Sequence, residues 1–422
     1  MRIELAAAAL AVLSAVPIPG RAEPAPSAPA AASAAGGSPP GAPAQGDAER
    51  KKLEEEIARE LGTASPSLAA RPPAPAPAAP VATSAPLGAG GSPYARVLLL
   101  PDISAIGSAG AAYDSYDVGA YSPRESPYSP KDRPDFFLEE VELGLQAVVD
   151  PYARADFFLS FGPDGAKVEE GYLTTLSLPD GLQIKAGQIF SPFGRQNQQH
   201  PHIWDFVDAP LARNRLLASD QLAGPGVDVA WLMPLPWFAE LHLAGQDTAP
   251  FTGDTNELTG LARLVQFFTL GDATSLGVGL SAARRHEGPN GAARDLGGAD
   301  VYLRIRPLNT RSYLAVQGEV YLRKLRGVEG EDPSTEHAWW TQAFWRQDAY
   351  WGYGVRYEQA PSAGSAPPGT EQRLGGVATW FPSEFQRLRL QLSWDRLPGG
   401  KGGLEALLHL EFGIGAHGAH PF

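Results

Sequence analysis

The end of the chain is the feature that most constrains its fold. Residues 405–415 alternate strictly between two sets of side chains. One set is apolar: Ala406, Leu408, Leu410, Phe412 and Ile414. The other set is mostly polar: Glu405, Leu407, His409, Glu411 and Gly413. Successive side chains of a β-strand point to opposite faces, so this period of two predicts a strand with one apolar and one polar face.

The same period recurs in the chain after residue 98. In 385–396, Leu388, Leu390, Leu392 and Trp394 share one face, and Arg387, Arg389, Gln391, Ser393 and Asp395 share the other. We expect about sixteen strands, each of about the length that a tilted strand needs to cross a bilayer. They are expected near 101–113, 135–149, 153–162, 167–177, 181–190, 226–234, 236–246, 258–270, 273–285, 297–306, 312–324, 337–346, 350–359, 370–381, 385–396 and 403–415.

The connections between these strands alternate between tight and long. Tight ones fall near 150–151, 179–181, 234–236, 271–272, 307–310, 347–348 and 382–384. A barrel with short periplasmic turns and long outer loops has this alternation. In hydrocarbon every backbone polar group needs a partner, so the sheet must close. The sequence therefore predicts an all-β fold, a transmembrane antiparallel up-and-down β-barrel of about sixteen strands.

The N-terminal region has a different composition. Residues 1–22 predict a signal peptide, because one arginine precedes a short apolar run that ends in proline and small residues. Residues 23–93 are rich in Pro and Ala and predict a disordered periplasmic linker. Within it, 47–61 predicts a short helix, which either self-associates or is a solvated helix without a specific role. The barrel is expected over 94–422, and export implies the cell outer membrane, reached through the periplasm.

Charge and composition exclude several functions. The chain has 34 Lys+Arg against 47 Asp+Glu, a net charge of -13, and no cysteine. An acidic chain lacks the basic surface that phosphate contacts require, so we expect no nucleic-acid partner. The absence of cysteine excludes disulfides and thiolate chemistry. No catalytic motif lies where the predicted structure would support it, so we expect no enzyme activity and no cofactor.

Three segments carry a resemblance to a known family. Residues 136–140 read Phe-Phe-Leu-Glu-Glu, 152–156 read Tyr-Ala-Arg-Ala-Asp, and 186–194 end in Ser-Pro-Phe-Gly. They resemble the opening hairpins of outer-membrane porins of the phosphate-selective O/P type. The end of the chain, 415–422, resembles that of porin-like proteins often labelled zinc-regulated TonB-dependent outer-membrane receptors. The resemblance implies a barrel in outer-membrane lipid that passes small hydrophilic solutes. Its oligomeric state stays undecided between a homotrimer and a monomer.

The resemblance also implies roles for the chain end and for one loop. The terminal aromatic Phe422 resembles the assembly signal read by the barrel-assembly machinery. In porins, the loop that corresponds to 190–225 can fold inward and narrow the pore. The residues that would face the solute from this loop are Arg195, His200, His202, Asp205 and Arg213.

Charged residues on the polar strand faces are candidates for lining the pore. The basic candidates are Arg154, Lys185, Arg304, Arg306, Arg323, Arg356, Arg387 and Arg389. The acidic candidates are Glu140, Glu142 and Glu319. An arginine-rich wall across from a more acidic wall would produce a transverse field that sets ion preference. Pairing of these charges between strands, which would simply keep the lumen wet, is the alternative.

His200 and His202 are also weak candidates for metal ligands, because imidazole and the nearby carboxylates are ligand types for zinc or copper. Their spacing matches no recognised metal motif. Three functions therefore stay open: a porin that passes small hydrophilic or anionic solutes by diffusion, a gated receptor or transporter for metal or metal complexes, and a non-conducting structural barrel.

Overall fold

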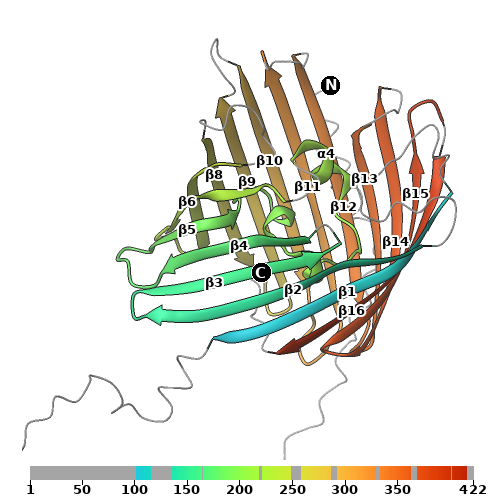
Figure 1. Cartoon of the computed structure of the whole chain (residues 1–422), viewed down its shortest axis with the longest axis horizontal. Coiled ribbons are helices and arrows are strands. Elements are labelled where there is room, and N and C mark those ends of the chain that lie inside the picture. Colours follow the sequence, from blue (N-terminus) through green and yellow to red (C-terminus); the bar gives the residue numbers. More distant parts are fainter. Residues whose placement is uncertain are drawn as a thin grey trace, which may run out of the picture. The chain divides into compact units, whose positions relative to one another are not determined.

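The computed structural model describes residues 101–115, 135–163, 165–217, 221–248, 258–286, 292–327, 333–362, 368–400 and 402–415. The predicted signal peptide 1–22, the linker 23–93 with its 47–61 helix, and Phe422 lie outside the described residues. The described part is almost entirely antiparallel sheet (Figure 1).

Sixteen strands follow one another in these residues. They are β1 (Asp102–Asp114), β2 (Asp135–Asp150), β3 (Ala153–Gly162), β4 (Gly165–Thr175), β5 (Leu182–Phe190), β6 (Ala223–Leu232), β7 (Phe238–Gln246), β8 (Thr259–Thr269), β9 (Thr274–His286), β10 (Ala293–Ile305), β11 (Tyr313–Arg326), β12 (Ser334–Arg346), β13 (Trp351–Pro361), β14 (Thr370–Ser383), β15 (Gln386–Arg396) and β16 (Gly402–Gly415). The predicted strand number is confirmed. The largest difference is at β10, which begins at Ala293 rather than at 297, because Gly297 and Gly298 carry no side chains that could show the alternation.

Each strand pairs with its neighbours in the chain, and the first pairs with the last. β1 and β16 are antiparallel, with a register that runs from Ser104 opposite Gly415 to Asp114 opposite Glu405. In Figure 1 they lie side by side, cyan against dark red. The sheet is thus a closed barrel without a free edge, and the predicted up-and-down fold is confirmed. None of the helices that the structure describes is long and apolar enough to span a membrane.

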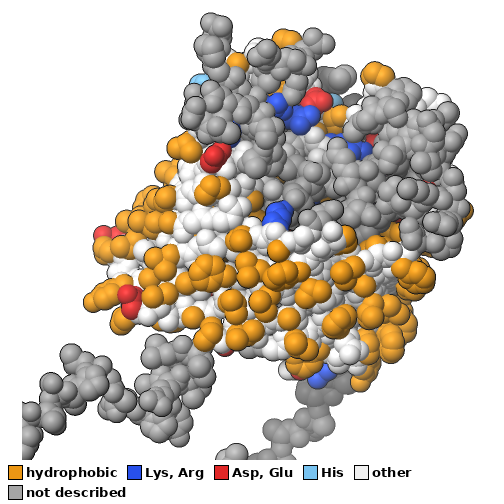
Figure 2. Space-filling model, viewed as in Figure 1, with side chains coloured by type: hydrophobic (Ala, Val, Ile, Leu, Met, Phe, Trp, Pro, Cys, Tyr) orange, Lys and Arg blue, Asp and Glu red, His pale blue; other side chains and the backbone are white. Residues whose placement is uncertain are grey.

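The barrel is apolar outside and polar inside. On β15, Leu390, Leu392 and Trp394 are 47%, 48% and 49% exposed. Their neighbours on the other face of the strand, such as Gln391 and Asp395, are completely buried. Figure 2 shows hydrophobic side chains spread over the outer surface of the strands. A water-soluble protein has the opposite distribution, so the outer surface is the kind that hydrocarbon solvates.

Aromatic side chains gather on the outside near the tight turns. Exposed members of this group are Tyr152, Trp231, Trp237, Phe238, Trp345, Tyr350, Trp351, Trp380 and Phe385. Such a belt is typical of a barrel at a membrane–water interface, where an aromatic ring meets both phases. Phe381, which follows Trp380 on β14, points inward instead, and its ring lies against the guanidinium of Arg346.

The connection between β5 and β6 contains the helices that the structure describes. They are η1 (Gln196–Gln198), η2 (Pro201–Ile203) and α4 (Leu211–Leu216). α4 packs on the inner faces of β11, β12 and β13. We call residues 191–222 the lumen loop, because most of its described residues, 191–217 and 221–222, lie against the inner wall of the barrel.

Candidate functional site: the lumen loop and the charged wall around it

The two ends of the lumen loop are tied together. The side-chain amide of Asn197 donates hydrogen bonds to the carbonyl oxygens of Ser191, at 3.1 Å, and Leu222, at 2.9 Å. The backbone N–H of Leu222 donates back to Asn197 Oδ1 at 2.7 Å. Because Asn197 is completely buried, this pairing satisfies polar groups that water cannot reach. It joins the two ends of the loop where the loop leaves β5 and enters β6.

Gly194 directs the chain into the lumen. Its φ is +66°, a conformation that favours glycine. Its N–H donates to Ser281 Oγ on β9 at 3.0 Å, and the N–H groups of Arg195 and Gln196 donate to Glu319 Oε1 on β11 at 2.9 and 2.6 Å. A Cβ atom at Gly194 would lie only 2.6 Å from Glu319 Oε2. The glycine that ends the 186–194 motif therefore permits both the turn and the close approach to the wall.

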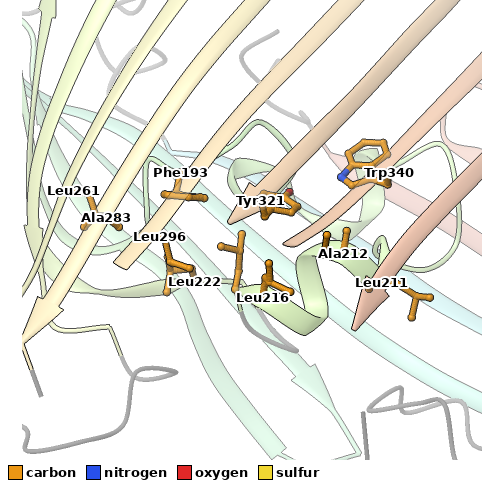
Figure 3. Packing of buried hydrophobic residues seen from close by; sticks show 13 residues of the cluster. Phe193, Leu211, Ala212, Leu216, Leu222, Leu261, Ala283, Leu296, Tyr321 and Trp340 are labelled. Carbon is orange, nitrogen blue, oxygen red and sulfur yellow. The ribbon is translucent and has the colours of Figure 1, made fainter. Parts of the chain in front are cut away.

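An apolar patch inside the barrel holds the second half of the loop. Figure 3 shows Leu211, Ala212 and Leu216 of α4 together with Phe193, Tyr321 and Trp340, which belong to one buried cluster. Leu222 of the loop belongs to the same cluster, and Leu261, Ala283 and Leu296 extend it across β8 to β10. Leu216, Leu222 and Phe193 are fully buried, at 0% exposed. Burial of a side chain of this size contributes about 1.5–3 kcal/mol, so the patch fixes α4 against the wall.

Four arginines of β13 to β15 hold the middle of the loop. We call Arg356, Arg373, Arg387 and Arg389 the arginine wall. Asp208 Oδ1 lies 2.5 Å from Arg356 Nη2, and Asp208 Oδ2 lies 2.9 Å from Arg373 Nη1. Burial raises the pKa of the Asp208 carboxyl, but Arg356 and Arg373 outweigh it and lower the pKa to about 2. The loop carboxylate therefore stays ionised between two guanidinium groups.

The other two members of the arginine wall bind loop backbone. Arg387 Nη1 and Arg389 Nη1 each donate to the carbonyl oxygen of Trp204 at 2.9 Å. Arg389 Nη1 also donates to the Phe206 carbonyl at 2.8 Å. These carbonyls belong to an irregular segment that has no helix or sheet partner for them. The arginines supply those partners, which is what a buried loop requires.

Four glutamates of β2 and β4 lie close together on the inner wall, and three of them contact the loop histidines. We call Glu140, Glu142, Glu169 and Glu170 the acidic wall. Glu142 Oε2 lies 3.1 Å from Nδ1 of His200 and 3.1 Å from Nδ1 of His202. Glu169 Oε2 lies 3.2 Å from His200 Nδ1, and Glu170 Oε2 lies 3.0 Å from His200 Nε2. Burial lowers the pKa of His200, but its contacts with Glu142, Glu169 and Glu170 outweigh this and raise the pKa well above its usual value.

A β-bulge explains how two adjacent glutamates reach the same cluster. In the pairing of β3 with β4, Phe158 lies opposite Glu170 and Leu159 lies opposite Val168, so no residue of β3 lies opposite Glu169. The extra residue lets Glu169 and Glu170 both face inward, and each is 7% exposed. A second bulge, between β1 and β2, falls at Glu139, whose Oε2 lies 2.6 Å from Nε2 of His409.

The two charged walls are near neighbours around the barrel. Only β16 and β1 separate β15 from β2 in the closed sheet. The expected arrangement, with an arginine-rich wall across from an acidic one, therefore does not describe these four arginines. Arg304 on β10, by contrast, lies half-way round the ring from β2. The difference arises because strands far apart in sequence become adjacent when the sheet closes.

Arginines and aromatic rings alternate along another part of the inner wall. Arg195 lies 4.1 Å from the centre of the Tyr302 ring, and Arg304 lies 4.6 Å from that of Tyr313. Arg346 lies 3.3 Å from the centre of the Phe381 ring. We call Arg195, Arg304 and Arg346 the arginine–aromatic row. A ring face attracts a cation without neutralising its charge, so these guanidinium groups keep their attraction for anions.

The remaining predicted residues lie in varied surroundings. Arg154 forms an ion pair with Asp156 at 2.6 Å, and Lys185 lies 4.3 Å from the centre of the Tyr172 ring. Arg323 pairs with Glu336 at 2.6 Å. Arg306 follows the last residue of β10 and is exposed at the tight turn rather than on the strand face where we expected it.

Two more candidates belong to the lumen loop. Asp205 Oδ2 accepts a hydrogen bond from Gln342 Nε2 at 2.9 Å, and burial raises the pKa of Asp205. Arg213 lies 5.3 Å from the centre of the Trp204 ring. Glu169, Glu170 and Arg346 were not among the residues predicted from the sequence. Two adjacent acidic residues inside a strand pattern were a signal for Glu169 and Glu170, because a regular strand would place one of them in lipid.

A cavity of about 260 Å³ lies on the tight-turn side of the loop. His202 and Ile203 of the loop form one side of it, and Arg387 and Glu411 form another. The turn residues Glu384 and Phe385 line its end. The cavity is thus bounded by the lumen loop on one side and by residues of a tight turn on the other.

Solved structures with the same architecture are outer-membrane channels. The outer-membrane channel DcaP of Acinetobacter baumannii matches with a TM-score of 0.54 and 12% identity, over 74% of this chain and 97% of that one. The anion-selective porin from Comamonas acidovorans matches with a TM-score of 0.52 and 9% identity, over 74% and 99%. OprB of Pseudomonas putida matches with a TM-score of 0.50 and 9% identity, over 74% and 94%. The class of fold is therefore a porin-like barrel.

A sequence relative shows the family. An uncharacterized protein of Aquifex aeolicus (strain VF5) is 31% identical over 333 residues, which are 68% of this chain and 70% of that protein. The chain belongs to the same family as this Aquifex aeolicus protein. No family model matches the sequence.

Proposed function

We propose that this protein is an outer-membrane channel through which small hydrophilic solutes diffuse, and that the lumen loop sets the width of its passage. The observation that carries the proposal is the combination of an apolar outer surface with a charged inner wall on which a loop is anchored. Hydrocarbon solvates the outside, and water and solute occupy the inside. The likeness of the fold to porins supports the same conclusion.

Anion preference is the second part of the proposal. The arginine–aromatic row places three guanidinium groups along the inner wall, and rings of basic side chains favour anions in other pores. The arginine wall serves mainly to hold the loop, since Arg356 and Arg389 are 2% and 1% exposed and contact loop atoms. Arg304, which was predicted to set selectivity, is therefore a better candidate for contact with solute than Arg356 or Arg389.

The remaining parts of the proposal follow from the sequence resemblance. The Ser-Pro-Phe-Gly motif supports kinship with porins of the phosphate-selective O/P type, for which an anionic solute is expected. Export through the periplasm, insertion by the barrel-assembly machinery through Phe422, and a homotrimer are proposed on the same basis. The predicted 1–22 signal peptide would be removed on export.

Single-channel recording in planar bilayers tests the proposal. The refolded protein is expected to give discrete conductance steps in potassium chloride. In a salt gradient, the reversal potential of an anion-preferring pore moves away from zero toward the equilibrium potential of chloride. Complete absence of conductance steps would contradict the proposal of a channel and favour a non-conducting structural barrel. A reversal potential that moves toward the equilibrium potential of potassium would overturn only the anion preference.

A further inference from the structure

Three buried side chains bring possible metal ligands together on the inner wall of the barrel. The ligand atoms of Glu142, His200 and His202 lie within 4.8 Å of one another. Glu142 Oε2 lies 3.1 Å from Nδ1 of each histidine. In a tetrahedral zinc site with bonds of about 2.0–2.2 Å, neighbouring ligand atoms are about 3.3 Å apart. The separations from Glu142 therefore need to change by only a few tenths of an ångström to accept such an ion.

The second ring nitrogen of His200 is fixed by a carboxylate. Nε2 lies 3.0 Å from Glu170 Oε2, and Glu170 Oε1 accepts the backbone N–H of Phe190 at 3.0 Å. A proton on Nε2 that donates to Glu170 leaves the lone pair of Nδ1 directed at Glu142 and Glu169. A metal-bound histidine almost always donates its other N–H in this way, which sets both the tautomer and the ring orientation.

Glu169 lies beside these three residues, next to His200. Its Oε2 lies 3.2 Å from His200 Nδ1, and it reaches the cluster only because of the bulge in β4. Bulges commonly direct a side chain toward a functional site at the expense of a regular ladder. The two imidazole nitrogens of His200 and His202 and the carboxylate oxygen of Glu142 form a donor set that suits zinc and similar divalent transition ions, whereas calcium and magnesium prefer oxygen alone.

The surroundings exclude water and leave one oxygen directed at the centre of the cluster. The rings of Phe158 and Phe190 lie 4.7 and 4.8 Å from that of His200. Glu142 is 2% exposed, and no group that the structure describes forms a hydrogen bond of good geometry to its Oε2, although both Nδ1 atoms are close. A buried carboxylate oxygen in this position is favourably placed to bind a cation.

We infer that Glu142, His200 and His202 bind one zinc-class divalent ion, which links the lumen loop to β2. The ion would replace a proton between the imidazoles and the carboxylates. It would also bring positive charge to the acidic wall, where the four glutamates lie close together. The ligands are buried against the barrel wall, and His202 also lines the cavity below the loop.

Metal analysis of the whole refolded chain tests the inference. The protein, without a polyhistidine tag, is treated with EDTA, exposed to zinc sulfate and dialysed, and its zinc content is measured by mass spectrometry. We expect about one zinc per chain, and at least about a tenfold weaker affinity for Glu142→Gln and for His202→Asn. His242→Asn is the matched control, because His242 lies between Asp228 and Glu240 outside the cluster and its loss should leave the zinc content unchanged.

X-ray absorption at the zinc edge supplies a readout that does not depend on variants. The wild-type spectrum is expected to contain two imidazole nitrogens at about 2.0–2.1 Å. The terminal histidines His417 and His420 are kept in every protein, so their contribution is common to all. Equal zinc content in wild type and His202→Asn, or a zinc shell of oxygen alone, would overturn the inference and leave the cluster as imidazolium–carboxylate pairs. If a variant fails to fold, judged by its heat-dependent mobility in gels, the wild-type spectrum decides.

Discussion

The carboxylate of Asp208 lies 2.5 Å from the guanidinium of Arg356, although the two residues are 148 positions apart in the chain. This ion pair crosses from the lumen loop to the inner face of β13. Asp208 also pairs with Arg373 and accepts a hydrogen bond from Gln391 at 2.7 Å. One loop side chain thus connects β13, β14 and β15, and it is the best single point at which to release the loop.

Replacement of Asp208 is expected to free the middle of the loop. Asp208→Ala leaves Arg356 and Arg373 buried with fewer counter-charges, and breaking a buried ion pair costs about 3–5 kcal/mol. We expect a larger and noisier single-channel conductance than in wild type, together with a lower thermal transition. Arg323→Gln is the control, because its pair with Glu336 is partly exposed and worth about 0–1 kcal/mol. Identical conductance for Asp208→Ala and wild type would show that this anchor does not limit the pore.

The same ion pairs predict how the loop responds to acid. The pKa of Asp208 in the folded protein is lowered to about 2 from an ordinary value near 3.8. A lowered pKa means that the stabilisation is complete above the ordinary value and is lost as the pH falls toward 2. Arg356 and Arg373 face this carboxylate and remain charged throughout that range.

Conductance recorded between pH 7 and pH 2.5 checks this expectation. The contribution of Asp208 should be constant down to about pH 4 and should decline below it, with larger and noisier currents. In Asp208→Asn this contribution is absent at every pH, so the variant should lack that part of the change. A wild-type profile that the Asn variant reproduces in full would assign the acid response to other groups.

The arginine–aromatic row predicts which substitutions alter ion preference. Arg304→Gln combined with Arg346→Gln removes two of its three charges and keeps hydrogen-bonding side chains. The reversal potential in a salt gradient is expected to move toward zero, because fewer fixed cations face the passage. Arg284→Gln is the matched control. It removes one arginine charge outside the arginine–aromatic row, from a side chain that is 49% exposed and lies near the partly buried Asp295. A double variant with an unchanged reversal potential would place selectivity elsewhere.

Gly194 predicts the importance of the turn that directs the loop inward. Gly194→Ala introduces a Cβ atom 2.6 Å from Glu319 Oε2 and a φ of +66° that costs about 1–2 kcal/mol for other residues. We expect a lower thermal transition and an altered conductance. Gly245→Ala is the control, because no atom lies within 4 Å of the position that its Cβ would occupy. Equal effects of the two substitutions would contradict this role for Gly194.

The outer surface predicts the cost of a charge on the lipid side. Leu392→Arg places a guanidinium on a side chain that is 48% exposed on the apolar face of β15. Such a change costs about 2–4 kcal/mol at the middle of the bilayer and less near the interfaces. The urea midpoint of folding into phospholipid vesicles should fall accordingly, whereas Leu392→Ile should leave it close to wild type. A midpoint for Leu392→Arg equal to that of wild type would contradict the assignment of this face to lipid.

The strands and their faces could be predicted from the sequence because both depend on a local property. The alternation of Leu388, Leu390 and Leu392 with Arg387, Arg389 and Gln391 shows which side chains share a face, whatever the strand pairs with. The tight and long connections then indicate an up-and-down order. The sixteen strands and the pairing of β1 with β16 confirm this part of the prediction.

The partners of the charged side chains could not be predicted in the same way. His200 is 58 residues from Glu142 and 30 residues from Glu170, and only the closed barrel with its inward loop brings them within 3.0–3.1 Å. The bulge that turns both Glu169 and Glu170 inward breaks the period on which the prediction rested. The sequence by itself determined that the chain alternates between oil-facing and water-facing residues, because that pattern is a property of each strand alone. Tertiary structure decided which charges meet, because contacts across the lumen depend on closure, register and the path of one loop.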